Sequence, residues 1–398
     1  MKVGYIIASK APLFSPIGYS VHIRSFIDNF VKIGGKIFLI RKAGDKNKLR
    51  NIEIYNLKWP VGPLKLQKLC DFFFNLKLYQ TGQKIIKIEK PDIIHEREMY
   101  LNFSGLLLAK KLNIPYVLEV NSIMMYEVRN SFPVYRKIHR IIEKKLYAES
   151  DGIIAVSDAI KNHLVSRGVP EEKIKVIPNG VDENIFNPSL SGQDVRKKYG
   201  LGKKHVIGFG GSLHQEWQGI DDLLKAARAI SSIERSVVFL IIGGTEAEIK
   251  KFQNIAPENV LFTGQVEHKK MPAYLAAADI LAAPYKKEKG LKDIGFYNSP
   301  IKLFEYMAMG KPVITSNIGQ ISEIIRHKQT GVLVEPGNDK DLTENILSLI
   351  EDDRLKRELG YNARDEVKKK YTWKQNAQRT MEVYREILEK SRQSLFSN

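Results

Sequence analysis

The sequence contains almost no cysteine and no long apolar run. Cys70 is the single cysteine among 398 residues, which excludes an internal disulfide framework and fits a reducing compartment. No stretch approaches the roughly 18 consecutive apolar residues of a membrane-spanning helix. The first apolar run, residues 3–8, is strand-like and too short for the apolar core of a signal peptide. We therefore expect a cytoplasmic protein.

Patterns typical of metal and nucleic-acid sites are also missing. The eight histidines are scattered, with no pair at H-x-x-x-H spacing and no cysteine partners. There is no zinc-finger spacing, ribonucleoprotein aromatic motif or basic repeat. We therefore expect no metal, no other cofactor and no nucleic-acid partner.

Acidic residues are fewer than basic ones. The chain has 63 Lys and Arg against 45 Asp and Glu, a net charge of +18. Residues 1–185 alone carry 30 basic and 18 acidic side chains. This excess favours an anionic partner for the first half, either a membrane surface or a charged substrate. A generally lysine-rich composition is the alternative explanation.

Short apolar runs, each followed by a helical stretch, recur along the chain and predict strands alternating with helices. The expected strands are residues 3–8, 36–40, 92–95, 116–120, 152–156 and 175–177, then 205–209, 237–242, 260–262, 280–283, 312–315 and 331–334. Such alternation predicts parallel sheets covered on both faces. Two series predict two doubly wound α/β domains.

We place the domains at residues 1–185 and 186–372, with the polar segment 186–202 as the linker. A helix over residues 373–395 could pack back on the first domain. Ligands of open parallel sheets bind at the carboxyl ends of the strands. We therefore expect the site in a cleft between two facing sheets.

Residues 299–314, SPIKLFEYMAMGKPVI, have the pattern of a capped helix followed by a buried strand. Ser299 is predicted as the N-cap and Pro300 as the first helical position. Lys302 and Glu305 then share one face of the helix. A lysine in the first turn suits a phosphate at the helix N-terminus, and a carboxylate can accept from sugar hydroxyls. The segment predicts a nucleotide diphosphate site, with a core helix bearing two solvated charges as the alternative.

Several segments together resemble one known family. Residues 176–188 resemble the V-I-P-N-G-V-D-x-x-x-F-x-P signature of family 4 glycosyltransferases, and residues 155–160 resemble the preceding strand and helix. Residues 299–314 resemble the S-P-x-K-L-F-E-Y-M-A motif of one branch of that family. The resemblance implies a GT-B fold, in which two facing Rossmann-like domains enclose a central cleft, and sugar transfer with retention of configuration.

The resemblance implies that the second domain binds a nucleotide-sugar donor. In the family, the loop holding Gly211, Ser212, Trp217 and Gln218 lies over the donor diphosphate. At the positions of Ser212 and Gln218 the family usually carries Arg and Lys, so two phosphate-facing charges are absent. Lys302 could supply one of them.

Glu305 matches the second glutamate of the family's Glu-x7-Glu motif, whose role is to hold the ribose hydroxyls. Tyr297 stands at the first glutamate, so the identity of the sugar cannot be carried over. Lys302 and Glu305 are our catalytic candidates. The other donor-side candidates lie at strand ends, in the sugar-facing loop and at the helix start: Gly243, Gly244, Gly264, Val266, Phe296, Tyr297, Ser299, Pro300 and Ile301.

The first domain is expected to bind the acceptor. Gly18 and Tyr19 follow its first strand, where the family has a glycine-rich loop. His95 and Glu96 end a strand among polar neighbours, although a local pairing would also explain His95. Asn121 stands where many relatives carry a histidine, so no general base is assigned.

Residues 59–79 mix lysines with leucines and phenylalanines. A basic amphipathic element of this kind can lie at a membrane interface. The alternative is a surface helix that buries its apolar face. Peripheral docking at the inner face of the cell membrane therefore stays open.

The sequence thus predicts a retaining glycosyltransferase that moves a sugar from a nucleotide-sugar donor, with UDP- or GDP-sugars favoured. The expected acceptor is a glycan or a lipid-linked molecule of cell-envelope polysaccharide or glycolipid synthesis, and no divalent ion is expected. Two alternatives remain. One is a GT-B nucleotide-sugar 2-epimerase, and the other is a non-catalytic nucleotide-sugar binding protein that lacks the usual charged residues.

Overall fold

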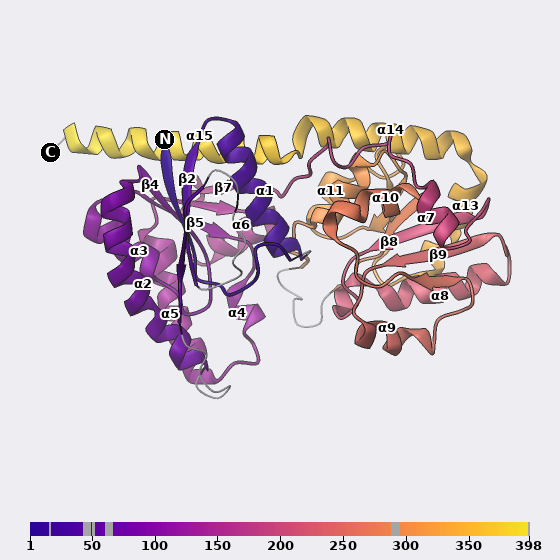
Figure 1. The fold of residues 1–398 in the computed structure, drawn as a ribbon, viewed down its shortest axis with the longest axis horizontal. Helices are drawn as coiled ribbons and strands as arrows, with labels where there is room; N and C mark the ends of the chain where they lie inside the picture. The colour runs from indigo at the N-terminus through magenta and orange to yellow at the C-terminus, as the bar shows by residue number, and fades with distance from the viewer. Residues whose placement is uncertain (16, 43–48, 50–51, 60–66, 288–294, 397–398) are drawn as a thin grey trace. The chain divides into compact units, whose positions relative to one another are not determined.

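The computed structural model describes residues 1–15, 17–42, 49, 52–59, 67–287 and 295–396. The chain forms two compact units (Figure 1). Unit 1 comprises Met1–Pro178 and Trp373–Asn398, and unit 2 comprises Asn179–Thr372. Residues 179–185 thus belong to unit 2 and not to the first domain, where the sequence prediction placed them. The reason is local, because Val181 forms a bridge with Thr372 and the Asn179 N–H donates to the Ser299 hydroxyl.

Unit 1 is built on a parallel sheet with the strand order β3-β2-β1-β4-β5-β6-β7. Within the described residues its strands are β1 (Lys2–Ile7), β2 (Lys36–Lys42), β3 (Ile54–Leu57), β4 (Ile93–Arg97), β5 (Tyr116–Val120), β6 (Gly152–Ala155) and β7 (Ile174–Val176). Its helices are α1 (Gly18–Lys32), α2 (Gln67–Glu89), α3 (Ser104–Leu112), α4 (Met124–Glu127), α5 (Pro133–Glu149), α6 (Asp158–Ser166), the short η2 (Glu171–Lys173) and α15 (Trp373–Phe396).

Helix α15 packs on α1 and on the sheet of unit 1, although it comes from the far end of the chain. Tyr384 of this helix lies in one core cluster with Tyr5, Phe26 and Phe30. Its ring centroid lies 5.8 Å from that of Phe30 in an edge-to-face contact. The amphipathic pattern of residues 373–395 therefore covers core side chains of unit 1.

Unit 2 is built on a parallel sheet with the strand order β10-β9-β8-β11-β12-β13. Its described strands are β8 (His205–Gly210), β9 (Val237–Ile242), β10 (Val260–Phe262), β11 (Ile280–Ala283), β12 (Val313–Ser316) and β13 (Val332–Val334). Its helices are α7 (Gln193–Lys198), α8 (Ile220–Ser231), α9 (Glu246–Gln253), α10 (Met271–Ala276), α11 (Ile301–Ala308), α12 (Gln320–Ile324), α13 (Asp339–Glu351) and α14 (Asp353–Lys370), with the short η3 (Glu216–Gln218) and η4 (His268–Lys270).

Both faces of the unit 2 sheet are buried, as strand β9 shows. Val238, Leu240 and Ile242 enter one core cluster with residues of α11 and α14, whereas Val237 and Phe239 enter a second cluster with residues of α8 and α13. The sequence of a strand that is buried on both faces is a continuous apolar run. The prediction of doubly wound α/β domains is therefore confirmed.

The strand order of each sheet reverses direction at its first strand. In unit 1 the reversal lies between β1 and β4, and in unit 2 it lies between β8 and β11. Ligands of doubly wound sheets bind at the carboxyl ends of the strands beside such a reversal. The loops after β8 and β11, and those after β1 and β4, are therefore the places to search for a site.

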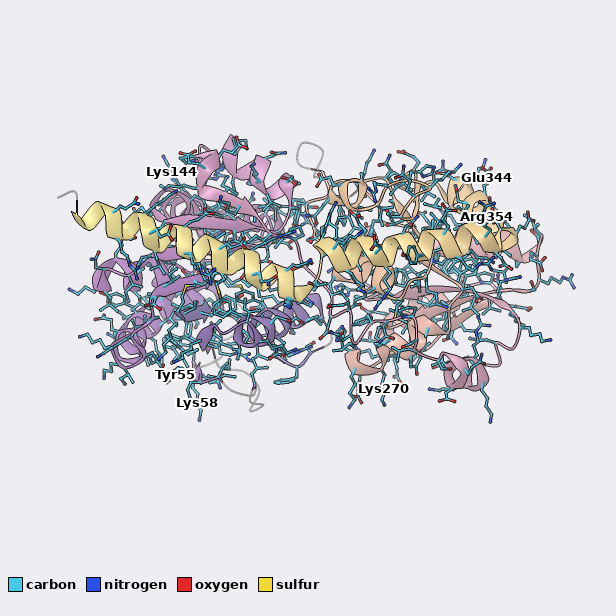
Figure 2. All side chains as sticks on the ribbon, turned by 90° about the horizontal axis from the view of Figure 1, so that it is seen from above. Tyr55, Lys58, Lys144, Lys270, Glu344 and Arg354 are labelled. Atoms are coloured by element: carbon cyan, nitrogen blue, oxygen red, sulfur yellow. The ribbon has the colours of Figure 1, made fainter. Side chains whose placement is uncertain are left out.

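Charged side chains cover the outer surfaces of both units, as the exposed Lys58, Lys144, Lys270 and Arg354 illustrate (Figure 2). Within the described part of the chain, no helix is both long and apolar enough to cross a membrane.

Candidate functional site

Three glycines follow three adjacent strands at the carboxyl edge of the unit 2 sheet. Gly211 comes after β8, Gly243 after β9 and Gly264 after β10, and the Gly243 N–H donates to the Gly264 carbonyl at 3.0 Å. A Cβ on Gly243 would lie 2.2 Å from the Gly211 carbonyl oxygen, and its φ of 122° also requires glycine. The edge is therefore bare backbone, which a phosphate can approach closely.

Lys302 lies beside this edge. A Cβ on Gly211 would lie 2.6 Å from the Lys302 Nζ, and that ammonium lies 4.0 Å from the ring centroid of Phe209. Its hydrogen-bond partner is the Gln218 side-chain oxygen. Among the residues that the structure describes, no carboxylate lies within ion-pair distance of Nζ. Burial lowers the pKa of Lys302 to about 7, although the charge of Glu305 opposes the shift.

Glu305 is held by a histidine that sequence reasoning missed. The Nε2 of His268 lies 2.7 Å from the Glu305 Oε1. His268 begins η4, and its ring centroid lies 5.5 Å from that of Phe186. The two residues are 37 positions apart. The signal that could have found it is its place shortly after β10 and Gly264, at the same edge of the sheet.

Aromatic rings form a cluster beside Lys302. Trp217 stacks on Tyr285 with centroids 5.8 Å apart, and Phe296 lies 5.2 Å from Tyr285. The Lys302 Nζ lies 5.5 Å from the Tyr285 centroid. The sequence-predicted Trp217 and Phe296 are thus brought together with Lys302, through a tyrosine that was not singled out.

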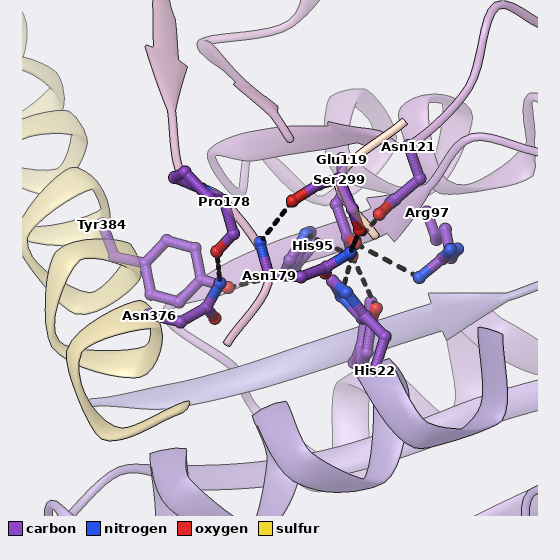
Figure 3. Close-up of polar contacts among 11 residues, drawn as sticks. His22, His95, Arg97, Glu119, Asn121, Pro178, Asn179, Ser299, Asn376 and Tyr384 are labelled. Atoms are coloured by element: carbon purple, nitrogen blue, oxygen red, sulfur yellow. Dashed lines mark hydrogen bonds and ion pairs between the residues drawn. The ribbon is translucent and has the colours of Figure 1, made fainter. Parts of the chain in front are cut away.

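Ser299 does not cap helix α11, so that part of the prediction was wrong. The helix begins at Ile301, Pro300 is its N-cap residue, and no side chain caps it. The Ser299 hydroxyl instead accepts the Asn179 N–H at 3.1 Å, and the Ser299 carbonyl accepts the Asn179 side-chain amide at 2.6 Å (Figure 3). The first-turn N–H groups of α11 are therefore left without a side-chain acceptor.

The two polar residues predicted to replace the family's basic pair lie in different surroundings. Gln218 is buried and bonds Lys302. The Ser212 hydroxyl instead bonds Nδ1 of the exposed His214, which also lies 2.9 Å from a Glu248 oxygen. Of these two residues, only Gln218 contacts Lys302.

The remaining donor-side candidates surround this edge. Val266 and Tyr297 are buried, and Ile301 is partly buried in the first turn of α11. Gly244 follows Gly243 at the end of β9, where a Cβ would meet the Leu213 side chain at 2.5 Å.

In unit 1, the corresponding edge is organised around the carboxylate of Glu119 (Figure 3). Its donors come from β1, α1, β4 and the end of β5: Tyr5 at 2.6 Å, His22 at 2.7 Å, Arg97 at 3.3 Å, and Asn121. The His95 Nε2 lies 3.4 Å from the same carboxylate, within ion-pair distance but without a hydrogen bond. Burial alone would raise the pKa of Glu119, but the interactions with His22 and Arg97 hold it well below its usual value. This carboxylate is fixed and fully surrounded.

His95 is locked into the same network. Its Nδ1 lies 2.6 Å from the Tyr384 hydroxyl of α15, and its ring stacks on Tyr5 with centroids 4.7 Å apart. Its partners are distant in sequence, so the alternative of a purely local pairing was wrong. Tyr19 joins the group because the Arg97 guanidinium lies 4.6 Å from its ring centroid.

Glu96 lies apart from this group. Successive side chains of a strand point to opposite faces, so Glu96 of β4 points away from His95 and Arg97. It accepts the Tyr116 hydroxyl, the Asn102 amide and, at 3.2 Å, the Gly105 N–H. Burial raises the pKa of Glu96 to about 7. Gly18, the exposed first residue of α1, makes no such contact among the described residues.

A second carboxylate cluster in unit 1 was not anticipated. Glu98, His139 and Glu143 place ligand atoms within 4.8 Å of one another, and all three are buried. The signal was the i,i+4 spacing of His139 and Glu143 on α5. However, the Leu101 N–H donates to the His139 Nδ1 at 3.3 Å, so the neutral ring carries its proton on Nε2. Neither nitrogen then offers a lone pair to a metal ion.

The surroundings of the cluster instead favour the protonated form of Glu98. Burial and the charge of Glu143 raise the pKa of Glu98 well above its usual value. The Tyr147 hydroxyl donates to Glu98 at 3.2 Å, and the Arg167 guanidinium lies 3.4 Å from Glu143. The set therefore ties α5 to the residue that directly follows β4.

The chain matches two family models, one in each unit. Residues 17–185 match the model described as Glycosyltransferase Family 4, and residues 204–352 match the model described as Glycosyl transferases group 1. An uncharacterized glycosyltransferase of Methanocaldococcus jannaschii is 26% identical over 384 residues, covering 94% of this chain and 95% of the relative. The capsular polysaccharide biosynthesis glycosyltransferase CapM of Staphylococcus aureus is 28% identical over 246 residues, covering 58% of this chain and 60% of CapM.

Solved structures show the same fold. Sucrose-phosphate synthase of Thermosynechococcus elongatus superposes with a TM-score of 0.75 at 20% identity, covering 98% of this chain and 99% of that one. HepE of Anabaena, solved with UDP and glucose, superposes with a TM-score of 0.71 at 20% identity, covering 96% and 98%. The fold is GT-B, and the chain belongs to the group 1 glycosyltransferases.

Proposed function

We propose that this glycosyltransferase transfers a sugar, with retention of configuration, from a nucleotide-sugar donor bound by unit 2. One observation carries the proposal. The Lys302 ammonium is partly buried beside the glycine edge of the sheet, and no described carboxylate pairs with it. A buried cation that lacks a counter-charge is costly, and a bound diphosphate would supply that charge.

The surrounding groups fit the parts of a nucleoside diphosphate. The uncapped N–H groups of α11 and the backbone at Gly211 are donors for phosphate oxygens. Glu305 can accept from the ribose hydroxyls, and the backbone at Gly243 and Gly264 borders the place for the base. HepE, a protein of the same fold, binds UDP, and this supports a UDP-sugar as the first donor to test, followed by GDP-sugars.

The chemical role of Lys302 is to stabilise the leaving group. Negative charge grows on the diphosphate as the glycosidic bond to it breaks, and a fixed cation at that position lowers the barrier. The negative charge of an arriving diphosphate would offset the desolvation that lowers the pKa, so Lys302 is protonated in the complex. Because Lys302 and the helix N–H groups provide this charge, we propose that transfer needs no divalent ion. The acceptor hydroxyl can pass its proton to a donor phosphate oxygen.

The acceptor is assigned to unit 1. Its basic excess suits an anionic glycan or a lipid-linked acceptor. Asn121 and Tyr19 are held at its strand edge by Glu119 and Arg97. Similarity to CapM, named for capsular polysaccharide biosynthesis, supports a role in cell-envelope polysaccharide or glycolipid synthesis.

Unit 1 also carries an apolar face suited to a membrane surface. Leu64, Lys65 and Leu66 of the predicted amphipathic element lie outside the described residues. Helix α2 buries Phe74 and Leu78, but it leaves Leu69, Phe73 and Leu76 exposed at helical spacing. We propose that this face docks on anionic lipid.

Vesicle flotation tests the docking proposal. Changing Phe73→Ser together with Leu76→Ser should reduce binding to anionic vesicles, while Ile233→Ser, an equally exposed aliphatic position in unit 2, should not. Equal binding by all three proteins would contradict it.

The donor proposal is tested by thermal unfolding with UDP, GDP, ADP, CMP and dTDP in the presence of EDTA. A ligand at 100 times its dissociation constant stabilises by about 2.7 kcal/mol, which is readily measured. Stabilisation by one nucleotide without metal would support the donor site and identify the base. No stabilisation by any of them would favour a non-catalytic protein, and turnover of the donor without an acceptor would favour an epimerase.

A further inference from the structure

The carboxylate of Glu305 is fixed on one side only. Its Oε1 lies 2.7 Å from the Nε2 of His268. In the part of the chain that the structure describes, no other side chain bonds this carboxylate. Glu305 is 7% exposed, whereas the His268 side chain is 27% exposed. One oxygen is therefore held in place and the other, Oε2, stays available.

The direction of this hydrogen bond is fixed by chemistry. A carboxylate can only accept, so the His268 Nε2 must carry the proton. The imidazole is itself held against the Phe186 ring, with centroids 5.5 Å apart. The contact therefore restricts rotation of the Glu305 carboxylate.

His268 also keeps Glu305 away from Lys302. These two residues are three positions apart on α11, a spacing at which Lys and Glu commonly form an ion pair. Here no such pair forms, because the Glu305 oxygen is engaged by His268 and the Lys302 ammonium by Gln218. The cation and the carboxylate thus remain separate, one beside the glycine edge and the other one turn further along the helix.

We propose that His268 is a positioning residue that orients Glu305 toward both hydroxyls of the donor ribose, and so makes the site select ribonucleotides over 2′-deoxyribonucleotides. The inference rests on the proposed donor site. A carboxylate aimed at a vicinal diol accepts from both hydroxyls. Removing the 2′-hydroxyl leaves a desolvated, charged acceptor without a donor, and hydrogen bonds to charged groups are the strong ones.

The test compares binding of UDP and GDP with their 2′-deoxy counterparts by calorimetry. The unaltered protein should bind the ribonucleotide at least about 10-fold more tightly. In His268→Ala this ratio should fall to within about threefold of unity, because the carboxylate is no longer oriented. His268→Gln can still donate from its amide and should keep most of the ratio. Lys270→Ala, an exposed neighbour on η4, is the matched control and should leave the ratio unchanged.

A purely structural role for His268 would weaken both ligands equally and leave the ratio as it was. That result, or a ratio near one in the unaltered protein, would overturn the inference while leaving the donor site intact. Binding of inorganic pyrophosphate distinguishes failure of this inference alone from failure of the proposed donor site. If the unaltered protein binds neither pyrophosphate nor any nucleotide, the proposed function and this inference both fail.

Discussion

The carboxyl edges of the two sheets differ in whether a buried charged side chain has partners of opposite charge. In unit 1, Glu119 is surrounded by donors that include His22 and Arg97. In unit 2, the neutral Gln218 is the one side chain among the described residues that hydrogen-bonds Lys302. The pKa of Glu119 is held well below its usual value, so its charged form is favoured, whereas burial lowers the pKa of Lys302 to about 7, so its charged form is disfavoured. The buried charge of the first edge has its counter-charges in place, whereas no described carboxylate pairs with Lys302 at the second, where a bound anion would supply the counter-charge.

The largest effect is expected from breaking the complete edge. Glu119→Ala would leave Arg97 and two histidines without their shared carboxylate, and the free energy of unfolding of unit 1 should fall by roughly 3–5 kcal/mol. Urea denaturation measures this loss. Glu386→Ala is the control, because Glu386 is 52% exposed and its pair with Lys175 should contribute less than about 1 kcal/mol. Similar losses in both variants would contradict the comparison.

The same carboxylate sets a pH dependence of stability. The folded-state pKa of Glu119 is depressed, so its contribution is fully present above the unfolded-state value of about 4.3. It should be lost as the pH falls through the lower folded-state pKa. Glu119→Gln should remove this part of the acid sensitivity.

The next effect is expected from removing the unpaired cation. Lys302→Ala should reduce transfer by about 10²–10³-fold, the range seen when a preorganised group facing developing charge is deleted. Stability should change little, because the variant removes a desolvated charge and creates no unpaired one. Steady-state kinetics and thermal unfolding are measured on the same preparation. Equal losses of activity and stability would contradict the leaving-group role.

A smaller effect is expected from pH. Above about 7 the free Lys302 becomes neutral, so binding UDP must take up a proton. The affinity for UDP should therefore fall by up to about tenfold per pH unit. Calorimetry between pH 7.5 and 8.5 covers a range in which the phosphates of UDP are essentially fully ionised and its uracil ring is still neutral. Lys302→Arg stays protonated and should show a flat profile, and parallel profiles would refute the assignment.

The smallest effect is expected from giving Lys302 a permanent partner. Gln218→Glu would convert the second edge into the arrangement of the first. The pKa of Lys302 should rise and stability should increase slightly, while UDP affinity should fall several-fold, because the anion would compete with a carboxylate already present. An unchanged UDP affinity would show that the Lys302 charge is not the binding determinant.

The fold was largely predictable because most of its strands are buried on both faces. Their continuous apolar runs alternate with helical stretches and predict the doubly wound sheets. The edge strand β3 was not predicted, since its sequence, Ile54–Leu57, is mixed and mostly not fully buried. Edge strands lack the apolar signal on which such predictions depend.

The site was predictable where its residues are neighbours in sequence. Lys302 and Glu305 share one helix, and the glycines follow within two residues of their strand ends. His268, His22 and Tyr384 were missed because tertiary packing alone brings them to their partners. Ser299 was assigned as a helix cap on local grounds. Its hydroxyl instead accepts a hydrogen bond from the backbone N–H of Asn179, 120 positions away. Local sequence rules thus identified the site residues that lie close together in sequence. They missed the tertiary contacts that orient those residues.

The return of the chain to unit 1 at Trp373 has a consequence for synthesis on the ribosome. Unit 2 is encoded without interruption, so it can fold as soon as its last residue leaves the exit tunnel. Unit 1 begins before unit 2, yet Tyr384 and Ile387 of its core are translated only after the whole of unit 2. Unit 1 is therefore completed after unit 2, and a message truncated before α15 would yield a complete unit 2 together with a unit 1 whose core is open.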